Sequence, residues 1–428
     1  MFFSTRFGFI PFFLLFILLF CLPLTAGTNE FRLGSERLFS DYYDLIEGKN
    51  IGFFGNKTSR VTLDRLIEDS RVEVKRIFVP EHGLDGTVLA GDSVADSLYR
   101  DIPVVSAYAP GKRKIDPADL SDLDCLVFEI QDIGNRHYTY LTTLYLQMTA
   151  CAQAGIPFIL LDRPNGGGDM VEGPVLEGAY QSYIGLFGPN AHGMTQGELA
   201  RLFLGEGELL DGGRYDRQGE YSVLTSLELH VVEMQNYDRE KGFWQKGYSG
   251  EDWISTSPNI PTPLSALCYK GNGLFDGYEI KEIVSQYSSM DLVQFQDIQL
   301  PRLKQKEELL YFIDRCYDNW NFEGLQLVPV KNEKTGNWDI LHFRVTDLAR
   351  FHSTLATLAI LYTWEELYYP GEENGYWDRD RFDKAMGNGW VSDIFMKEQL
   401  VPFAQLAERV SRDEEAFRAI RANYLIYN

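Results

Sequence analysis

Four carboxylic acids lie at or just beyond the ends of short apolar runs in the sequence: Glu81, Asp132, Asp162 and Glu172. Near apolar neighbours, a carboxyl group can have its pKa raised and hold a proton near neutral pH. Glycoside hydrolysis needs such a group to protonate the leaving oxygen, and commonly a second carboxylate that activates water or attacks the sugar. These residue types therefore favour acid and base chemistry by carboxylates.

Glu81 is the most suggestive of these acids. It follows the apolar run 77–80 and precedes His82 and Gly83, which predicts a buried strand that ends in a tight turn. The alternative interpretation is an acid in an exposed loop that has no chemical role.

The motifs of several other chemistries are missing from the sequence. It contains no His-Glu-x-x-His zinc motif, no GxSxG nucleophile elbow and no Walker phosphate loop. The first predicted strand runs into residues 52–56 rather than into a GxGxxG turn, and the glycines at 271–273 do not follow a predicted strand. We therefore expect neither a catalytic metal nor a nicotinamide or flavin cofactor.

Short apolar runs alternate with helical patterns along the sequence, and this alternation predicts a parallel sheet that positions these residues. The predicted strands and helices of this part are strands 50–54, 74–79, 125–130 and 157–161 and helices 62–69 and 138–154. Polar clusters with turn-forming residues follow the strands, at 56–58, 80–83, 131–134 and 162–165. Because carboxyl ends of parallel strands meet at one edge, we expect these clusters to share a rim, although loops are polar for other reasons too. The fold predicted is a Rossmann-like α/β domain.

Thr195 and Glu198, still in the first domain, form a capping-box pattern, which indicates a structural role for Glu198.

A smaller α+β domain is predicted for the rest of the chain. The proline-rich segment 253–263 cannot be regular structure and suggests a seam between domains. Beyond it, the patterns predict strands 325–330 and 341–345 and helices 348–364, 391–410 and 413–427. The predicted domains are 27–262 and 263–428.

The first 26 residues have the pattern of a secretory signal peptide. A short start with Arg6 precedes the apolar stretch 7–22, and small residues at 23–27 offer a cleavage site. The apolar stretch is shorter than the roughly 20 residues that span a bilayer. We expect export to a periplasm or to the outside of the cell, with no membrane span after signal removal.

The overall charge limits the partners of the protein. With 62 acidic and 40 basic residues, the formal net charge is −22. Such a field repels phosphate backbones, so we expect no binding to nucleic acid.

The same polar clusters carry a resemblance to the bacterial exo-β-N-acetylmuramidases. The segments that resemble motifs of this family run in order through most of the chain: FVPEHGLDG (78–86), DLDCLVFEIQDIGNRHYTY (122–140), LLDRPN (160–165) with VEGP (171–174), HGMTQGELA (192–200) and WISTSPNIPT (253–262). The resemblance implies a Rossmann-like domain and a smaller one with the active cleft between them. It also implies cofactor-independent release of N-acetylmuramic acid from the non-reducing end of peptidoglycan fragments, so that the expected substrate is a muropeptide or another amino-sugar glycoside.

The resemblance places the family's proposed catalytic acid, the glutamate of the PEHG motif, on Glu81. In this hypothesis Glu81 protonates the glycosidic oxygen, and His82 and Asp132 orient it or position water. The expected sugar-binding residues are Arg136, Tyr138, Asn165, Glu172, His192 and Asn259. Two of these have structural alternatives: Arg136 as a helix-start residue paired with an acid, and His192 as a turn residue bonded to the backbone.

One segment departs from the family pattern. Family members carry a loop of the form EGTNxSxGRGT, whereas residues 275–283 read FDGYEIKEI and lack its arginine. Lys281 could supply a positive charge, but a point charge does not reproduce the two-pronged grip of a guanidinium on a carboxylate. Two alternatives to the muramidase therefore stand, a non-catalytic protein that binds peptidoglycan fragments and a glycosidase of altered sugar specificity.

Overall fold

The computed structural model describes residue 1 and residues 30–89, 91–109, 111–206, 223–244, 253–275, 283, 294–369, 378–395 and 400–427. Residues from Phe31 onward form one compact unit. The predicted signal peptide, apart from residue 1, and positions 276–282 of the divergent segment lie outside the described residues. Among the helices of the described ranges, none has the length and apolar character needed to cross a bilayer.

A seven-stranded sheet forms the centre of the N-terminal part, in the order β3-β4-β2-β1-β5-β6-β7. Its strands are β1 (Asn50–Gly55), β2 (Glu73–Val79), β3 (Ser97–Tyr99), β4 (Ile102–Ser106), β5 (Cys125–Glu129), β6 (Phe158–Leu161) and β7 (Leu229–Val232). Neighbouring strands are parallel except for β3 and β4. The strands predicted in this part correspond to β1, β2, β5 and β6, whereas β3, β4 and β7 were not predicted.

Helices cover both faces of this sheet: α1 (Gly34–Leu38), α2 (Arg60–Glu68), α3 (Tyr140–Ala154) and α4 (Gln196–Gly205). Consecutive strand residues point to opposite faces. Phe54 therefore enters the core that contains α3 and α4, and Phe53 enters the core that contains α1 and α2. Burial on both faces explains why the central strands are continuous apolar runs rather than alternating ones.

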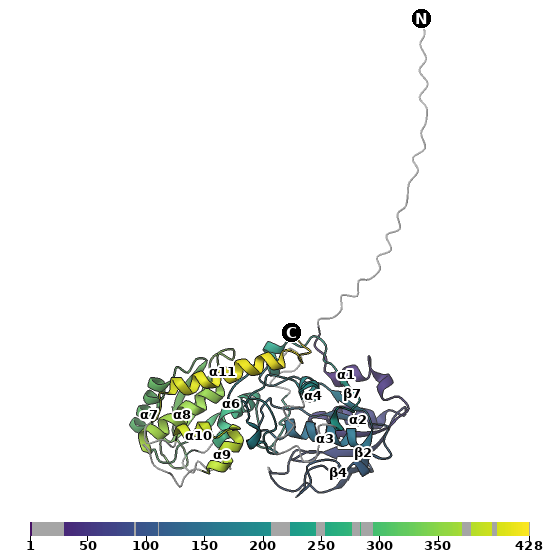
Figure 1. Cartoon of the computed structure of the whole chain (residues 1–428), viewed down its shortest axis with the longest axis horizontal. Helices are drawn as coiled ribbons and strands as arrows, with labels where there is room; N and C mark the ends of the chain where they lie inside the picture. Colours follow the sequence, from purple (N-terminus) through teal and green to yellow (C-terminus); the bar gives the residue numbers. More distant parts are fainter. Residues whose placement is uncertain are drawn as a thin grey trace. The chain divides into compact units, whose positions relative to one another are not determined.

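The C-terminal part contains a three-stranded antiparallel sheet and most of the remaining helices. The sheet has the order β8-β10-β9, with β8 (Asp297–Gln299), β9 (Leu325–Val330) and β10 (Ile340–Val345). The helices are α6 (Pro263–Asn272), α7 (Lys306–Asn319), α8 (Ser353–Tyr368), α9 (Arg379–Met386), α10 (Trp390–Phe395) and α11 (Phe403–Arg421). Figure 1 shows α7, α8 and α10 together on one side and the seven-stranded sheet on the other. The predicted α/β fold with a smaller α+β part is confirmed.

The helices near the C terminus differ from the prediction. Instead of helices at 391–410 and 413–427, α10 ends at Phe395, and α11 begins after Pro402 and runs unbroken to Arg421. Proline restricts the residue before it and lacks an N–H, so it belongs at a helix start rather than inside the predicted helix. The helix continues through 411–413 because Val410 and Phe417 both pack into the core. Helix α8 likewise starts at Ser353 and not at 348, since the His352 side chain caps it.

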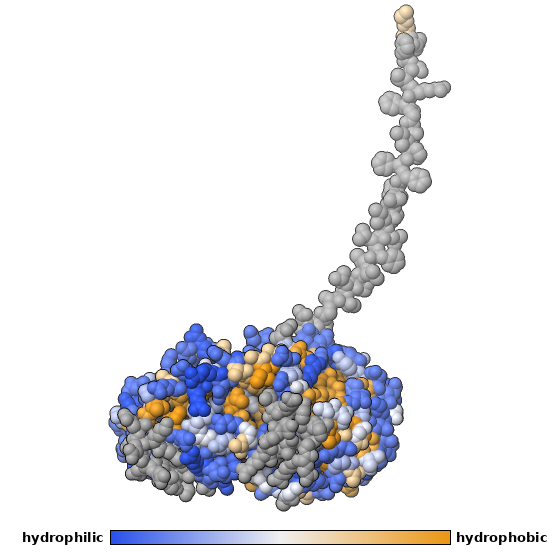
Figure 2. All heavy atoms as spheres, viewed as in Figure 1, coloured by the Kyte–Doolittle hydropathy of each residue, from blue (hydrophilic) through white to orange (hydrophobic). Residues whose placement is uncertain are grey.

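Residues 253–262 contain no helix or strand, as their prolines predict, and α6 begins at Pro263. The division into domains at this point stays a prediction. The face of the molecule shown in Figure 2 is mainly hydrophilic, with hydrophobic residues in separate patches.

Candidate active site

The polar clusters that follow the strands do meet at one edge of the sheet. The backbone N–H of Gln131, after β5, donates to Thr58 Oγ1, after β1, over 3.1 Å. The Gln131 side chain donates to the carbonyl oxygen of Pro164, after β6, over 2.8 Å. The predicted rim is therefore present, because parallel strands bring their carboxyl ends to the same side.

Glu81 lies in the tight turn expected after β2. The N–H of Gly83 donates to the carbonyl oxygen of Pro80 over 3.1 Å, and both His82 and Gly83 adopt a φ of 73°. A positive φ is uncommon for a residue with a side chain, although histidine tolerates it better than most. The His82 Nδ1 atom donates to the carbonyl oxygen of Val88 over 2.6 Å, which fixes the orientation of the ring.

The Glu81 side chain is buried and held at both oxygens. It is 6% exposed. Its Oε1 accepts the N–H of Gly91, and its Oε2 accepts the hydroxyl of Thr139, each over 2.8 Å. Burial raises the pKa of the nearby Tyr108 hydroxyl, and the Glu81 carboxylate raises it further. Glu81 is therefore not an acid in an exposed loop.

A cavity of about 150 Å³ opens beside Glu81 and draws its lining from both parts of the chain. Four predicted residues line it: Glu81, His82, Tyr138 and Asn259. Residues that the sequence reasoning missed also line it, among them His137, Thr139, Tyr269 and Phe295. Tyr269 belongs to α6 and Phe295 precedes β8, so the C-terminal part closes the cavity. Aromatic rings beside a carboxyl group are suited to hold a sugar.

Asp132, Asn165 and His192 form a second group, around Gly134. Asp132 Oδ2 accepts the N–H of Gly134 over 3.2 Å and lies 3.9 Å from His192 Nε2. Asn165 Oδ1 packs closely on Gly134: a Cβ added to Gly134 would lie 2.0 Å from this oxygen. Gly134 also has a φ of +76°. Among the described residues, Asp132 Oδ1, Asn165 Oδ1 and His192 Nε2 are buried without a hydrogen-bond partner. Orphaned buried polar atoms are rare and often mark functional sites.

Burial sets the protonation of this second group. It raises the pKa of Asp132 to about 7, although bonds from the Gly134 and Ile133 backbone and the charge of Lys270 oppose the shift. It lowers the pKa of His192 to about 3, and the ring is therefore neutral at physiological pH. His192 Nδ1 accepts the N–H of Met194 over 3.2 Å, the backbone contact of the alternative interpretation, and the ring proton then sits on Nε2.

Four of the six predicted sugar-binding residues do not line the Glu81 cavity: Asn165 and His192, which belong to the second group, and Arg136 and Glu172. The Arg136 guanidinium is fully buried and donates to the carbonyl oxygens of Gly188 and Ala385 over 2.9 and 2.7 Å. Glu172 Oε2 accepts the N–H of Thr354 over 3.1 Å at the start of α8. Both residues join the two parts of the chain. Glu172 also lines a larger cavity of about 1,110 Å³ that lacks Glu81.

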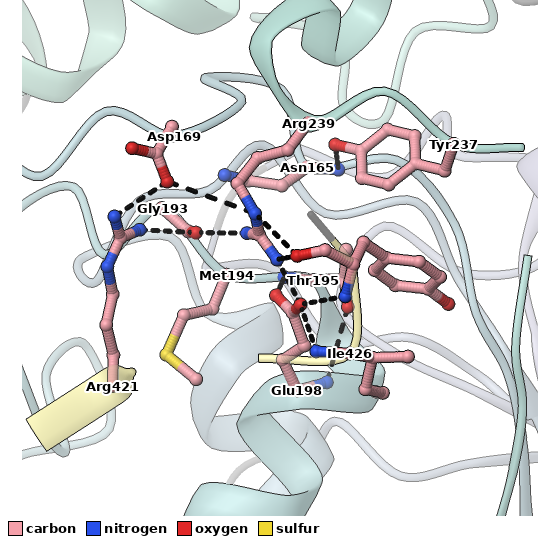
Figure 3. Close-up of polar contacts among 12 residues, drawn as sticks. Asn165, Asp169, Gly193, Met194, Thr195, Glu198, Tyr237, Arg239, Arg421 and Ile426 are labelled. Atoms are coloured by element: carbon pink, nitrogen blue, oxygen red, sulfur yellow. Dashed lines mark hydrogen bonds and ion pairs between the residues drawn. The ribbon is translucent and has the colours of Figure 1, made fainter. Parts of the chain in front are cut away.

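The loop that carries His192 is held from both sides by arginines (Figure 3). Arg239 and Arg421 each donate to the carbonyl oxygen of Gly193, over 2.8 and 2.7 Å. Arg239 also pairs with the buried Glu198, whose other oxygen accepts the N–H of Thr195 in the predicted capping box. The C-terminal segment thus fixes the loop, since α11 supplies Arg421.

Comparison with known proteins identifies the family. The sequence profile of the N-terminal domain of the exo-β-N-acetylmuramidase NamZ matches residues 51–264, and that of its C-terminal domain matches residues 267–427. The chain belongs to the NamZ family. It is 31% identical over 415 residues to the peptidoglycan β-N-acetylmuramidase NamZ of Bacillus subtilis. The aligned region covers 94% of this chain and 93% of that protein. This membership makes the chain an enzyme of the glycosidase class.

Solved structures share the NamZ-family fold. A DUF1343 family protein from Bacteroides fragilis superposes with a TM-score of 0.74 at 27% identity, covering 93% of this chain and 99% of that one. A second protein of that family and organism has a TM-score of 0.65 at 23% identity with the same coverage, and it supports the fold alone.

Several site residues of this NamZ-family chain had a weak signal in the sequence. Thr139 lies inside the matched segment 122–140, three residues beyond Arg136, and could have been chosen there. Lys270 and Tyr269 lie on α6, outside every segment that resembles a motif of the family. Nothing local to α6 indicates that it packs against the rim of a sheet more than 100 residues earlier in the chain.

Proposed function

We propose that this protein is an exo-acting glycoside hydrolase that releases N-acetylmuramic acid from the non-reducing end of peptidoglycan fragments, with Glu81 as general acid. The observation that carries the proposal is the buried Glu81 carboxyl group, oriented at both oxygens by Gly91 and Thr139 at the wall of a cavity. The name of the Bacillus subtilis relative supports the substrate class.

In the proposed reaction, Glu81 gives its proton to the glycosidic oxygen as the bond between that oxygen and the anomeric carbon breaks. Water then supplies the hydroxyl of the released sugar. Asp132 is not among the residues that line the cavity, so its proposed role is to orient the neighbouring groups rather than to contact this water. His82, Tyr138 and Asn259 line the cavity and would contact the sugar.

The test is turnover of a chromogenic β-N-acetylmuramide and of the matching β-N-acetylglucosaminide by the mature protein. We expect cleavage of the muramide, and a loss of at least about 100-fold in kcat for Glu81→Gln. Glu333→Gln, at an exposed position between β9 and β10, is the matched control and should keep full activity. A tetrasaccharide labelled at the reducing end checks exo action, because exo cleavage shortens the labelled fragment by one sugar from the non-reducing end, whereas endo cleavage yields shorter labelled fragments directly.

A second candidate function is binding of peptidoglycan fragments without turnover, which the divergent sequence at 275–283 favours. In that case neither substrate is cleaved, while calorimetry detects binding of a muropeptide to the wild type and to Glu81→Gln alike. Cleavage of another glycoside in a panel, with the muramide left intact, would instead indicate altered sugar specificity.

Export is also proposed, on the signal-peptide pattern of the first 26 residues. Expression of the full chain followed by cell fractionation and N-terminal sequencing tests it. We expect a mature protein in the periplasm or medium that starts after Ala26 or Gly27, and an uncleaved cytoplasmic protein would contradict the proposal.

A further inference from the structure

The larger of the two cavities described above lies between the N-terminal and C-terminal parts of the chain. Its volume is about 1,110 Å³, above the roughly 300–1,000 Å³ that is common for ligand pockets. Residues within 167–172 and 240–244 line it from the N-terminal part, and residues 345–352 line it from the C-terminal part. Among the described residues, none lines both this cavity and the one beside Glu81. The proposed reaction therefore leaves this cavity without a use.

A third cavity, of about 290 Å³, shares a wall with the larger one, because residues 350–352 line both. Each of the two has a tryptophan in its lining, Trp244 in the larger cavity and Trp320 in the smaller one. Two cavities that share a wall and offer one indole ring each suit an extended ligand of repeating units better than a single compact molecule.

Trp244 presents its ring among charged groups. The residue is 37% exposed, although large apolar side chains are mostly buried in this protein. Its neighbours in the lining include Asp169 and Lys241. The wall also contains the buried Glu172, whose Oε1 has no hydrogen-bond donor among the described residues. A ligand that matches such a lining has both an apolar face and hydroxyl or amide donors, and a pyranose ring of a sugar has both.

Arg350 supplies an accessible positive charge in the wall that the two cavities share. Its side chain is 66% exposed and pairs with the half-exposed Asp347 at 3.8 Å. An exposed pair at this distance adds little to stability, and the guanidinium can still grip a carboxylate. The net charge of −22 disfavours a polyanion, so the ligand that fits carries scattered carboxylates on a neutral frame.

We propose that these two cavities form a second carbohydrate site, which holds the glycan strand of peptidoglycan away from Glu81. Trp244 stacks on the apolar face of one sugar, and Arg350 binds the carboxylate of a lactyl substituent. The identity of the glycan rests on the proposed function. The site would keep the enzyme on its polymer while the Glu81 cavity acts on a chain end.

The test is calorimetric binding of a peptide-free peptidoglycan tetrasaccharide to the mature protein, with Glu81→Gln in every variant so that no turnover occurs. We expect Trp244→Ala to raise Kd by at least about fivefold, because the stacking surface is lost. Trp244→Phe keeps an aromatic face and should restore most of the affinity. Tyr311→Ala, an exposed aromatic on α7 that lines neither cavity, is the matched control and should bind as the parent does.

An unchanged Kd for Trp244→Ala would overturn the proposal, as would equal losses in Trp244→Ala and Trp244→Phe. Binding of a free stem peptide but not of the glycan would also overturn it, since the site would then take a peptide.

Turnover separates this inference from the proposed function. In the chain that keeps Glu81, Trp244→Ala should leave kcat/KM on the chromogenic muramide unchanged, because that substrate has a single sugar. If the muramide is not cleaved but glycan binding depends on Trp244, the proposed reaction fails while the second site stands. If the muramide is cleaved and glycan binding ignores Trp244, only the second site fails.

Discussion

The hydroxyl of Thr139 donates a 2.8 Å hydrogen bond to Glu81 Oε2 and so joins the residue before α3 to the turn after β2. The N–H of Gly91 holds the other oxygen at the same distance. Two elements that are far apart in the sequence therefore set the orientation of one carboxyl group. A general acid depends on such orientation as much as on its chemical type, because proton transfer requires a short, aligned contact.

Replacing Thr139 with valine should lower kcat by about tenfold, since the hydrogen bond to the carboxyl group is lost while the shape is kept. KM should change little, because valine keeps the shape that Thr139 gives to the cavity wall. Steady-state kinetics on the chromogenic muramide measure both constants. Thr139→Ser keeps the hydroxyl and should restore most of the rate; if both variants lose activity equally, the hydrogen bond is not the cause.

The stability of the protein should depend on pH through Asp132. Its pKa is about 7 in the folded protein, above the ordinary 3.8. The folded state therefore binds the extra proton, and the contribution of Asp132 to stability is full below pH 3.8 and is lost as the pH rises to about 7. The unfolding temperature of Asp132→Asn should therefore rise relative to that of the wild type as the pH increases from 4 to 7. The difference should remain at pH 8. Calorimetry at pH 5 and 8 checks this, and a constant difference would contradict it.

Gly134→Ala should destabilise the protein by about 2–4 kcal/mol in urea unfolding, because the position combines a φ of +76° with a Cβ that would lie 2.0 Å from Asn165 Oδ1. Gly155, at the end of α3, is the matched control. Its φ is +71° and an added Cβ would meet nothing within 4 Å, so Gly155→Ala carries the backbone strain alone. Equal losses in the two variants would argue against close packing of Asn165 on Gly134.

The ion pair between Arg239 and Glu198 should contribute to stability far more than a surface pair. Glu198 is fully buried, and its Oε1 also accepts the N–H of Ile426 over 2.8 Å. Arg239→Met leaves this carboxylate buried without its cation and should lower the free energy of unfolding by about 3–5 kcal/mol. Arg201→Met removes the exposed pair with Glu233 and should cost less than about 1 kcal/mol. Comparable costs for the two arginines would mean that the buried pair is not what fixes the C-terminal segment.

Much of the edge of the sheet that carries Glu81 could be predicted from the sequence, because the signals are local. The residues Pro-Glu-His-Gly after β2 form a tight turn, and this turn places Glu81 at the end of the strand. The capping box of Thr195 and Glu198 is likewise decided within a few residues. Side-chain alternation along β1 assigns Phe53 and Phe54 to opposite cores without reference to distant parts of the chain.

The tertiary structure alone decided which predicted residues share a cavity. Tyr138 and Asn259 join Glu81, whereas Arg136 and Glu172 are taken up by contacts between the two parts of the chain. It also placed Lys270 against the rim. The physical reason is that residue type and turn chemistry act over a few neighbours, while packing and burial, which set both the partner of a charged group and its pKa, depend on segments that meet only when the whole chain has folded.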